Sequence, residues 1–287
     1  MLEILNKELK SYFHSSASYI FLFVFLLISG IFFTLSNLIP GSGLYPNLLY
    51  AMIFVFLFLV PILTMKTIAS ETHEKTDQLL LTAPLKIWEI VLGKFLAAAV
   101  VFLLAVIITF IYPLILKNFG AIPLGETIGA YIGFILIGLC FISIGVFISS
   151  LTENQVTAAI GTFGALFIIW MLDWISSGLS TTITAGVIFA GVLVVLISLF
   201  LYYNTQNVVV SIFAGILGAL IVLIIYLKNK NLYDGFIAKF VSWFSLMKRY
   251  EPFNMGMLSA SSIAYYISFS VFFIILTIHI IDRRRWN

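Results

Sequence analysis

A dense group of ionisable side chains lies between two apolar runs, in residues 66–88. Within this segment His73 is followed directly by Glu74, the pair that begins the zinc-protease motif H-E-x-x-H. That motif needs a second histidine four residues after the first, and residue 77 here is Asp77. The segment therefore lacks a metalloprotease site, and its charges indicate recognition of another molecule.

Other patterns that would give the chain a catalytic or cofactor site are incomplete. No G-x-S-x-G nucleophile motif occurs. Gly93-Lys94 lacks the upstream glycine of a phosphate-binding loop and is followed by Phe95. Cys140 is the single cysteine, which excludes an intramolecular disulfide and a cysteine metal site. The three histidines are scattered: His14, His73 and His279. We expect no catalytic residue, metal or cofactor in this chain.

The segment 66–88 has the pattern of a short surface helix followed by a turn. Its first half is polar, and then come Leu79-Leu80-Leu81 and Thr82-Ala83-Pro84. Thr82 can cap a new helix, with Pro84 in the first turn, where a missing N–H costs little. A polar helix beside three leucines suits docking into a groove on another protein. The alternative is a solvated loop between two spans.

The composition of the chain indicates the kind of secondary structure that flanks this segment. Of the 287 residues, 62% are hydrophobic and 9% are charged, and the mean hydropathy is +1.15. Ordinary soluble domains are about half apolar and about a quarter charged. These values exclude a soluble enzyme, a disordered chain and a nucleic-acid-binding domain. Backbone groups in hydrocarbon must bond to each other, so the continuous apolar runs predict an all-α polytopic membrane protein.

We expect eight membrane spans, since about 20 apolar residues are needed for each. A six-span alternative would place one or both of 183–203 and 208–227 on the membrane surface or as re-entrant segments. The eight candidates are residues 19–38, 47–68, 88–116, 127–151, 156–176, 183–203, 208–227 and 263–281.

The distribution of lysine and arginine predicts the orientation. Eight spans put both ends of the chain on one side, together with segment 66–88 and the run Arg283-Arg284-Arg285. The positive-inside rule then makes both termini cytoplasmic, in a multi-pass protein of the plasma membrane. No short apolar core followed by a small-residue cleavage site opens the chain, so we expect no cleavable signal peptide.

The first fourteen residues differ from the spans. Apolar residues recur there at helical spacing, which predicts an amphipathic helix in the cytoplasmic interface. The helix is either a simple anchor or a brace that also contacts a partner. Its apolar face is formed by Leu2, Leu5, Leu9, Tyr12 and Phe13.

The long outer loop 228–262 also contains helical periodicity. Aromatic residues at three- and four-residue steps over 236–247 predict an amphipathic helix on the outer membrane surface. Residues 251–266 would form a re-entrant turn, with Pro252 and Gly256 as breaks. The alternative is interfacial packing over the ends of the spans. The candidate outer-gate residues are Phe253, Gly256, Tyr265 and Tyr266.

Segment 66–88 and the start of the third span resemble the ABC-2 type permeases. The residues concerned are Glu71-x-x-Glu74-Lys75-Thr76-x-Gln78-Leu79-Leu80-Leu81-Thr82-Ala83-Pro84, followed by Trp88-Glu89-Ile90-Val91-Leu92-Gly93-Lys94-Phe95. Lys75 replaces the usual glycine of the permease pattern, and Gln78 the usual glutamate. The start of the chain resembles the opening helix of the same family, through Leu5-Asn6-Lys7-Glu8-Leu9-Lys10-Ser11-Tyr12-Phe13. The end resembles the gliding-motility-associated subfamily, through Phe253-Asn254-Met255-Gly256-Met257-Leu258, Tyr265-Tyr266-Ile267-Ser268-Phe269 and Arg283-Arg284-Arg285-Trp286.

The resemblance implies a single ABC-2 type transmembrane domain over 1–287, without an ATPase of its own. In such permeases the segment after the second span is a coupling helix that inserts into an ATP-binding subunit. The polar turn after the fourth span, with Glu153, is a second candidate contact. The implied coupling residues are Glu71, His73, Glu74, Lys75, Thr76, Gln78, Leu79, Leu80, Leu81, Thr82, Pro84 and Glu153.

The partners implied are two copies of an ATP-binding subunit, which would bind ATP and Mg²⁺, a second permease copy or paralogue, and membrane lipid, but no nucleic acid. The leading hypothesis is thus the permease subunit of an ABC exporter, with an amphipathic or hydrophobic cargo. A membrane anchor without a transport path is an alternative. An intramembrane enzyme is disfavoured, because the span interiors are almost devoid of acids, histidines and lysines.

Overall fold

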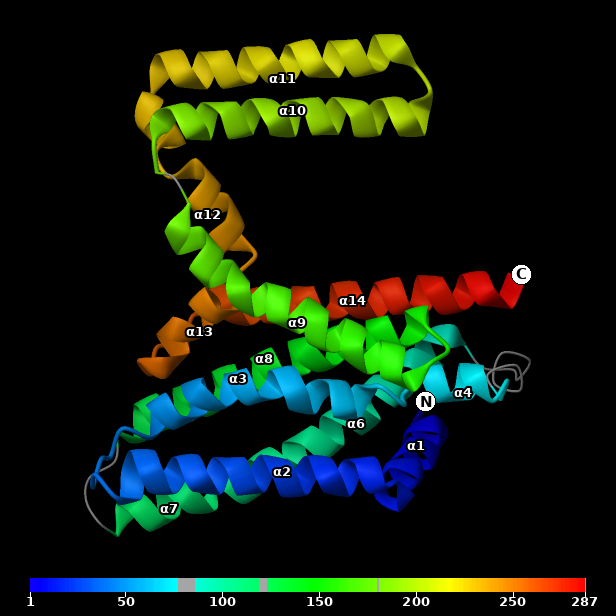
Figure 1. Cartoon of the computed structure of the whole chain (residues 1–287), viewed down its shortest axis with the longest axis vertical. Helices are drawn as coiled ribbons and strands as arrows, with labels where there is room; N and C mark the ends of the chain where they lie inside the picture. The colour runs from blue at the N-terminus through cyan, green and yellow to red at the C-terminus, as the bar shows by residue number, and fades with distance from the viewer. Residues whose placement is uncertain (77–85, 119–122, 180, 287) are drawn as a thin grey trace. The chain divides into compact units, whose positions relative to one another are not determined.

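The computed structural model describes residues 1–76, 86–118, 123–179 and 181–286, with residue 286 described by its backbone alone, and every long element in these ranges is a helix. Within these described ranges, eight helices are long and apolar enough to cross a membrane, which confirms the all-α prediction and the eight candidate spans. They are α2 (Ser16–Phe33) with its π-helical extension η1 (Thr34–Leu38), α3 (Tyr45–Thr64), α6 (Ile87–Thr109), α8 (Leu124–Leu151), α9 (Gln155–Gly178), α10 (Ile183–Thr205), α11 (Val208–Lys228) and α14 (Ala260–Trp286) (Figure 1).

Two of the spanning helices are longer than the ranges predicted from their apolar residues. The final span does not stop at residue 281, because α14 continues through the three arginines to Trp286. The second span bends after Thr64 and continues into a short helix, α4 (Ala69–His73), so that the apolar segment runs directly into the charged one.

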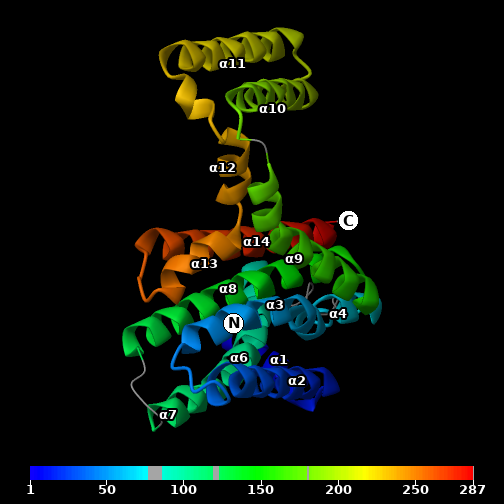
Figure 2. The same ribbon diagram turned by 60° about the vertical axis from the view of Figure 1, so that its left-hand side comes forward.

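Residues Met1–Trp170 and Arg249–Asn287 form one compact unit. In this unit α8 packs against α3 and α14, and α6 packs against α8 and α2. Figure 2 shows α14 running beside α8. The core is rich in aromatic rings, since Phe56 contacts Phe102, Phe134 and Phe141 with ring centroids 4.7–6.3 Å apart. Bulky rings that interlock in this way fix the relative rotation of the helices that carry them.

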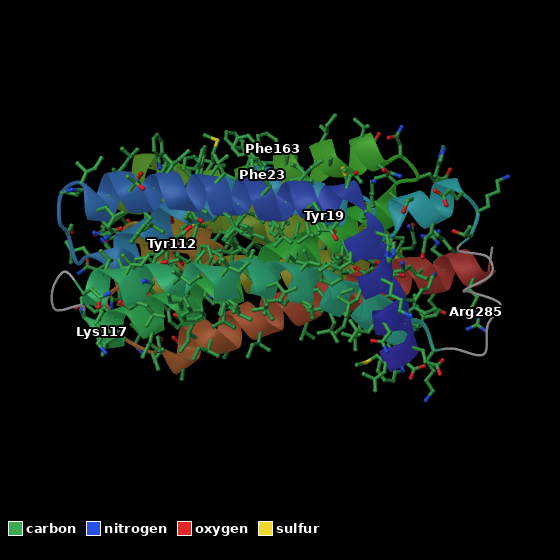
Figure 3. All side chains as sticks on the ribbon, turned by 90° about the horizontal axis from the view of Figure 1, so that it is seen from below. Tyr19, Phe23, Tyr112, Lys117, Phe163 and Arg285 are labelled. Atoms are coloured by element: carbon green, nitrogen blue, oxygen red, sulfur yellow. The ribbon has the colours of Figure 1, made fainter. Side chains whose placement is uncertain are left out.

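The two ends of this unit carry different elements. Lys117, at the end of α7 (Ile111–Lys117), and Arg285 lie at opposite ends (Figure 3). At the Lys117 end, α13 (Leu246–Asn254) packs on the start of α8, because Phe253 lies against Gly133 and Gly256 lies against Gly129. Gly256 has φ +73°, a conformation that favours glycine. Gly129 and Gly133 on α8 therefore leave room for the end of α13 and the turn after it.

One of the two predicted breaks in the outer loop needs correction. Gly256 lies in the turn after α13, as predicted, whereas Pro252 lies inside α13 and does not end it. Tyr265 and Tyr266 belong to α14 and are not part of a turn. The helix predicted over 236–247 is interrupted, because α12 ends at Trp243 and α13 begins at Leu246.

Residues Met171–Lys248 form a second unit, described here by itself. Its main elements are the antiparallel hairpin of α10 and α11, the 3₁₀ turn η2 (Lys230–Tyr233) and α12 (Phe236–Trp243). The Phe189 ring contacts Phe236 and Phe240 at 6.1 and 5.4 Å, which holds α12 against α10. In the same unit Ser245 donates a 2.6 Å hydrogen bond to the Asp173 carboxylate.

Candidate functional site

The described part of the charged segment begins at a capped bend between α3 and α4. Ser149, from the end of α8, accepts hydrogen bonds from the backbone N–H groups of Ile68 and Ala69, both at 3.1 Å. Its hydroxyl also donates to the Met65 carbonyl at 3.3 Å. The first N–H groups of a helix have no partner within the helix, so this serine from a neighbouring span fixes where α4 starts.

The end of α4 is a Schellman turn. The Thr76 N–H donates to the Glu71 carbonyl at 2.9 Å, and the Lys75 N–H donates to the Thr72 carbonyl at 3.2 Å. This turn needs a left-handed residue after the helix, and Lys75 has φ +56° there. It is the position where the permease pattern has glycine, so the structure gives a backbone reason for that glycine.

A buried lysine joins α4 to two other helices. Lys94, in the second turn of α6, is 2% exposed. Its ammonium lies 2.8 Å from Glu71 Oε2 on α4, 3.0 Å from Glu8 Oε1 on α1 (Leu2–His14), and 2.9 Å from the Thr67 carbonyl. An ammonium has three N–H donors, and these three acceptors can use all of them. We call Glu8, Glu71 and Lys94 the charge cluster.

The charge cluster depends on a close crossing of α1 over α6. A Cβ on Gly93 would lie 2.8 Å from Ile4 Cγ2, so only glycine permits this approach without displacement. Ile4, Glu8 and Tyr12 recur at four-residue steps and form the buried stripe of α1. The glycine before Lys94 therefore determines that Glu8 reaches it.

Tyr12 makes a second polar contact at this crossing. Its hydroxyl lies 2.9 Å from Thr67 Oγ1 and donates to the Leu63 carbonyl at 3.2 Å. Burial raises the pKa of the Tyr12 hydroxyl above its usual range, so it stays neutral and able to donate. Thr67 is thus held by both α1 and α6, through Tyr12 and Lys94.

The residues of the apolar face predicted for α1 differ in burial. Tyr12 is buried in the protein, whereas Leu5 and Leu9 are half-buried. Leu2 and Phe13 are exposed, by 70% and 38%. The helix thus packs one stripe against the spans and leaves apolar residues exposed beside it, an arrangement compatible with the predicted interfacial helix.

The final span reaches α4 from the other side. Arg284 donates through Nη1 to Thr72 Oγ1 at 3.1 Å and through Nη2 to the Ser150 carbonyl at 2.7 Å. The planar guanidinium can bridge two acceptors in this way, and one ammonium could not keep both with the same geometry. Neighbouring residues of α4, Glu71 and Thr72, are therefore bound to α6 and α14.

A polar cavity of about 460 Å³ opens beside the charge cluster. Three lysines and three glutamates line it, so it can accept a polar or charged side chain from another molecule. Gln155, at the start of α9, also lines the cavity. The ionisable lining residues are Lys7, Lys66, Lys94, Glu8, Glu71 and Glu74.

The structure separates the predicted coupling residues into groups. Glu71 is fixed in the charge cluster. His73, Glu74, Lys75 and Thr76 are exposed at the tip of α4, and Glu153 is exposed in the turn between α8 and α9. The rest of the predicted set lies outside the described residues: Gln78, Leu79, Leu80, Leu81, Thr82 and Pro84.

Sequence reasoning missed the residues that position α4. Glu8, Lys94 and Arg284 each lie within a motif, but the sequence predicts no contact with α4 for any of them. A signal existed for Lys94, because it is a lone charge inside an apolar run and such a residue is expected to have a specific partner. Nothing in the sequence indicated that Glu8 would be its partner.

The predicted outer-gate residues lie at the opposite end of the same unit. Phe253 and Tyr266 are fully buried with ring centroids 6.2 Å apart, and Gly256 lies on the first turn of α8. Tyr265 lies under the Arg249 guanidinium, 4.6 Å from its ring centroid. The three aromatic residues are in ring contact near the start of α14, and Gly256 packs on the start of α8.

Comparison with known proteins gives one family. The family model described as "ABC-2 family transporter protein" matches residues 2–280, nearly the whole chain. A search of curated proteins finds no match to this sequence.

Proposed function

This chain belongs to the ABC-2 transporter family, and from that premise we propose that it is the permease subunit of an ATP-driven exporter, coupled to a separate ATP-binding subunit through α4 and the segment after it. The observation that carries the proposal is the charge cluster. It connects α4 to a buried position of α6 through the 2.8 Å contact between Glu71 and Lys94, and the same ammonium contacts Glu8 on α1 and the Thr67 carbonyl.

The contacts of α4 provide a path for movement. A displacement of α4 acts on α3 through the chain, on α6 through Lys94, on α8 through Ser149 and on α14 through Arg284. Four spans are thus tied to one short helix. A partner that moves α4 would shift these spans together as a rigid body, which is how domain movements are transmitted between packed elements.

The exposed tip supplies the surface for the partner. His73, Glu74, Lys75 and Thr76 are exposed, and the predicted docking leucines follow them in the sequence. Glu153 is a second candidate contact. The sequence has no phosphate-binding loop, so ATP and Mg²⁺ would be bound by the partner. Two ATP-binding subunits would then serve a pair of permease chains.

The distribution of cations supports placing this end in the cytoplasm. Lys7, Lys66 and Lys94 surround α4, and the three arginines at the end of α14 lie at the same end. The positive-inside rule assigns such an end to the cytoplasm. Both termini would then be cytoplasmic, with Phe253 and the residues packed around it on the outer side.

The test is co-expression of the chain with the ATP-binding subunit encoded beside it, followed by co-purification and an ATPase assay. Glu74→Arg reverses one exposed charge at the tip. The matched control is Glu251→Arg, an exposed acid on α13 at the opposite end of the unit. We expect Glu74→Arg to lower the yield of the complex by roughly tenfold, which corresponds to about 1.4 kcal/mol, and Glu251→Arg to leave it unchanged.

Deletion of residues 70–78 is the stronger version of this test. We expect no stable complex and no substrate-stimulated ATPase activity. Normal assembly and stimulated hydrolysis in the deletion variant would contradict the coupling assignment. A complex that assembles through α4, yet whose ATPase rate never responds to a hydrophobic or amphipathic cargo, would instead indicate the membrane-anchor function.

A further inference from the structure

The hairpin of α10 and α11 carries an apolar surface that the second unit does not cover. On α10 only Gly186 and Ala190 are buried, and on α11 only Ser211. Both helices are apolar on every side, which is typical of helices surrounded by lipid or by other membrane helices. Something in the membrane must therefore cover most of both helices.

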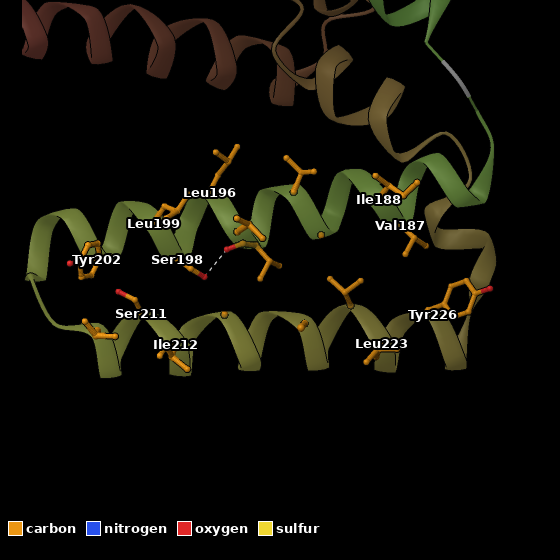
Figure 4. A pocket seen from close by; sticks show the side chains of 18 residues that line it. Val187, Ile188, Leu196, Ser198, Leu199, Tyr202, Ser211, Ile212, Leu223 and Tyr226 are labelled. Carbon is orange, nitrogen blue, oxygen red and sulfur yellow. Dashed lines mark hydrogen bonds between the residues drawn. The ribbon is translucent and has the colours of Figure 1, made fainter.

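A groove of about 1090 Å³ lies along this hairpin (Figure 4). Its volume is at the upper limit of pockets for drug-sized ligands, ~300–1,000 Å³. The lining is almost entirely aliphatic. The two serines in it are satisfied by their own helices, since Ser198 donates to the Val194 carbonyl at 2.8 Å and Ser211 to the Asn207 carbonyl at 3.2 Å. The groove thus suits a hydrocarbon chain.

Close packing on one side gives the groove a defined wall. A Cβ on Gly215 would lie 3.1 Å from Ser198 Oγ, and one on Gly218 would lie 2.6 Å from Val194 Cγ1, so the helices nearly touch there. Gly191 also lines the groove, yet a Cβ on it would meet nothing within 4 Å. Gly191 therefore faces open space that a ligand can occupy.

The two ends of the groove differ in charge. At one end Tyr226 lines the groove, and the Lys230 ammonium lies 5.2 Å from its ring centroid. Lys228 ends α11 at the same end, and the Lys239 ammonium donates to the carbonyl of Asp234, just after η2, at 3.0 Å. The turn at the other end, residues 204–207, is Asn-Thr-Gln-Asn and carries no charge. Only the Tyr226 end can attract an anion.

We propose that this groove is a binding site for one membrane phospholipid, with an acyl chain along α10 and α11 and the phosphate beside Lys228 and Lys230. The aliphatic lining matches the chain, and the cations at one end match the headgroup and orient it. Tyr226 lies between the two, at the level where aromatic rings are favoured. The site does not depend on coupling to an ATPase.

A second copy of the chain is the main competing occupant. An apolar helix of a second copy could pack on the aliphatic lining, but it would not account for the lysines at one end of the groove. Charge complementarity therefore favours phosphate. The two occupants are also distinguishable by mass, because one adds a lipid to the chain and the other adds a whole subunit.

The experiment is native mass spectrometry of the full chain released from vesicles of phosphatidylglycerol or of phosphatidylcholine. Gly191→Leu places a bulky side chain in the groove, at a position where the added Cβ would meet nothing within 4 Å. Its matched control is Gly164→Leu on α9, where a Cβ also meets nothing within 4 Å. We expect one retained phospholipid in the wild type and in Gly164→Leu, and loss of that lipid in Gly191→Leu. Circular dichroism checks that both variants remain helical.

A second variant tests the headgroup. Replacing Lys228 and Lys230 by glutamine should reduce the occupancy by phosphatidylglycerol, by about fivefold for each lysine, and that by phosphatidylcholine less. Lys117→Gln, at the end of α7, is the control cation. Equal lipid retention by Gly191→Leu and the wild type would overturn the proposal. So would a change from dimer to monomer in Gly191→Leu with no lipid lost, since the groove would then be an interface between copies.

Discussion

The ammonium of Lys94 lies 2.8 Å from Glu71 Oε2, although Lys94 lies in the second turn of a membrane span and Glu71 belongs to a polar surface helix. Glu8 approaches the same ammonium at 3.0 Å. Lys94 is 2% exposed, and burying a charged group at such a position is costly without partners of opposite charge. The contact between Lys94 and Glu71 therefore attaches the charged segment to the spans.

Removing the lysine should leave two carboxylates without their shared cation. For Lys94→Met we expect a loss of about 3 kcal/mol in the free energy of unfolding, at the lower end for a broken buried pair because Lys7 remains 3.4 Å from Glu71. The measurement is thermal unfolding of the purified chain in detergent.

The triple variant Lys94→Met, Glu8→Leu, Glu71→Met separates stability from coupling. Apolar replacement of a whole buried charge cluster is often neutral, so we expect unfolding close to that of the wild type. The ATPase of the assembled complex should nevertheless lose stimulation by substrate. Full stimulation in this variant would show that the cluster serves folding alone.

Lys75 occupies a backbone conformation that suits glycine. Lys75→Gly should stabilise the chain by about 1 kcal/mol, and Lys75→Val should destabilise it, because a β-branched residue is strained at φ +56°. Gln206, with φ +52°, is the matched control outside the segment. Chemical denaturation should give similar gains for Lys75→Gly and Gln206→Gly. A destabilised Lys75→Gly would mean that the lysine side chain has a role that the turn does not explain.

Arg284 differs from its two neighbours in its contacts. Arg284→Gln should cost about 1.5 kcal/mol of stability, the value for a hydrogen bond to a charged group. Arg283→Gln and Arg285→Gln should cost less, since the contacts to Thr72 and the Ser150 carbonyl belong to Arg284. Hydrogen exchange of residues 69–76 is the specific readout, and we expect faster exchange in Arg284→Gln only. Identical exchange in all three variants would contradict a clamp on Thr72.

The close crossing of α1 over α6 at Gly93 predicts that an alanine substitution there lowers stability, although alanine usually stabilises a helix relative to glycine. Alanine favours helix over glycine by about 1 kcal/mol, so Gly164→Ala, which has free space, should be neutral or stabilising. Gly93→Ala should instead destabilise by about 1–3 kcal/mol, because its methyl group would overlap Ile4. Limited proteolysis of the first fourteen residues should accelerate in Gly93→Ala. If proteolysis of both variants matches that of the wild type, α1 is not held by this crossing.

The sequence by itself determines the spans of this protein, because a bilayer requires long apolar helices and about 20 residues suffice to identify each one. All eight are present. It also determines the helical period of the first fourteen residues, which form α1 as expected. These properties depend on residues close together in the chain, so composition and periodicity reveal them.

Only the tertiary structure decided which charges meet. Glu8 and Lys94 are 86 positions apart, and Arg284 and Thr72 are 212 apart. Whether such side chains meet depends on how each helix is rotated and where two helices cross, and at Gly93 that crossing is set by the absence of one methyl group. Periodicity places a residue on a face of its own helix, but packing alone decides which neighbours that face contacts.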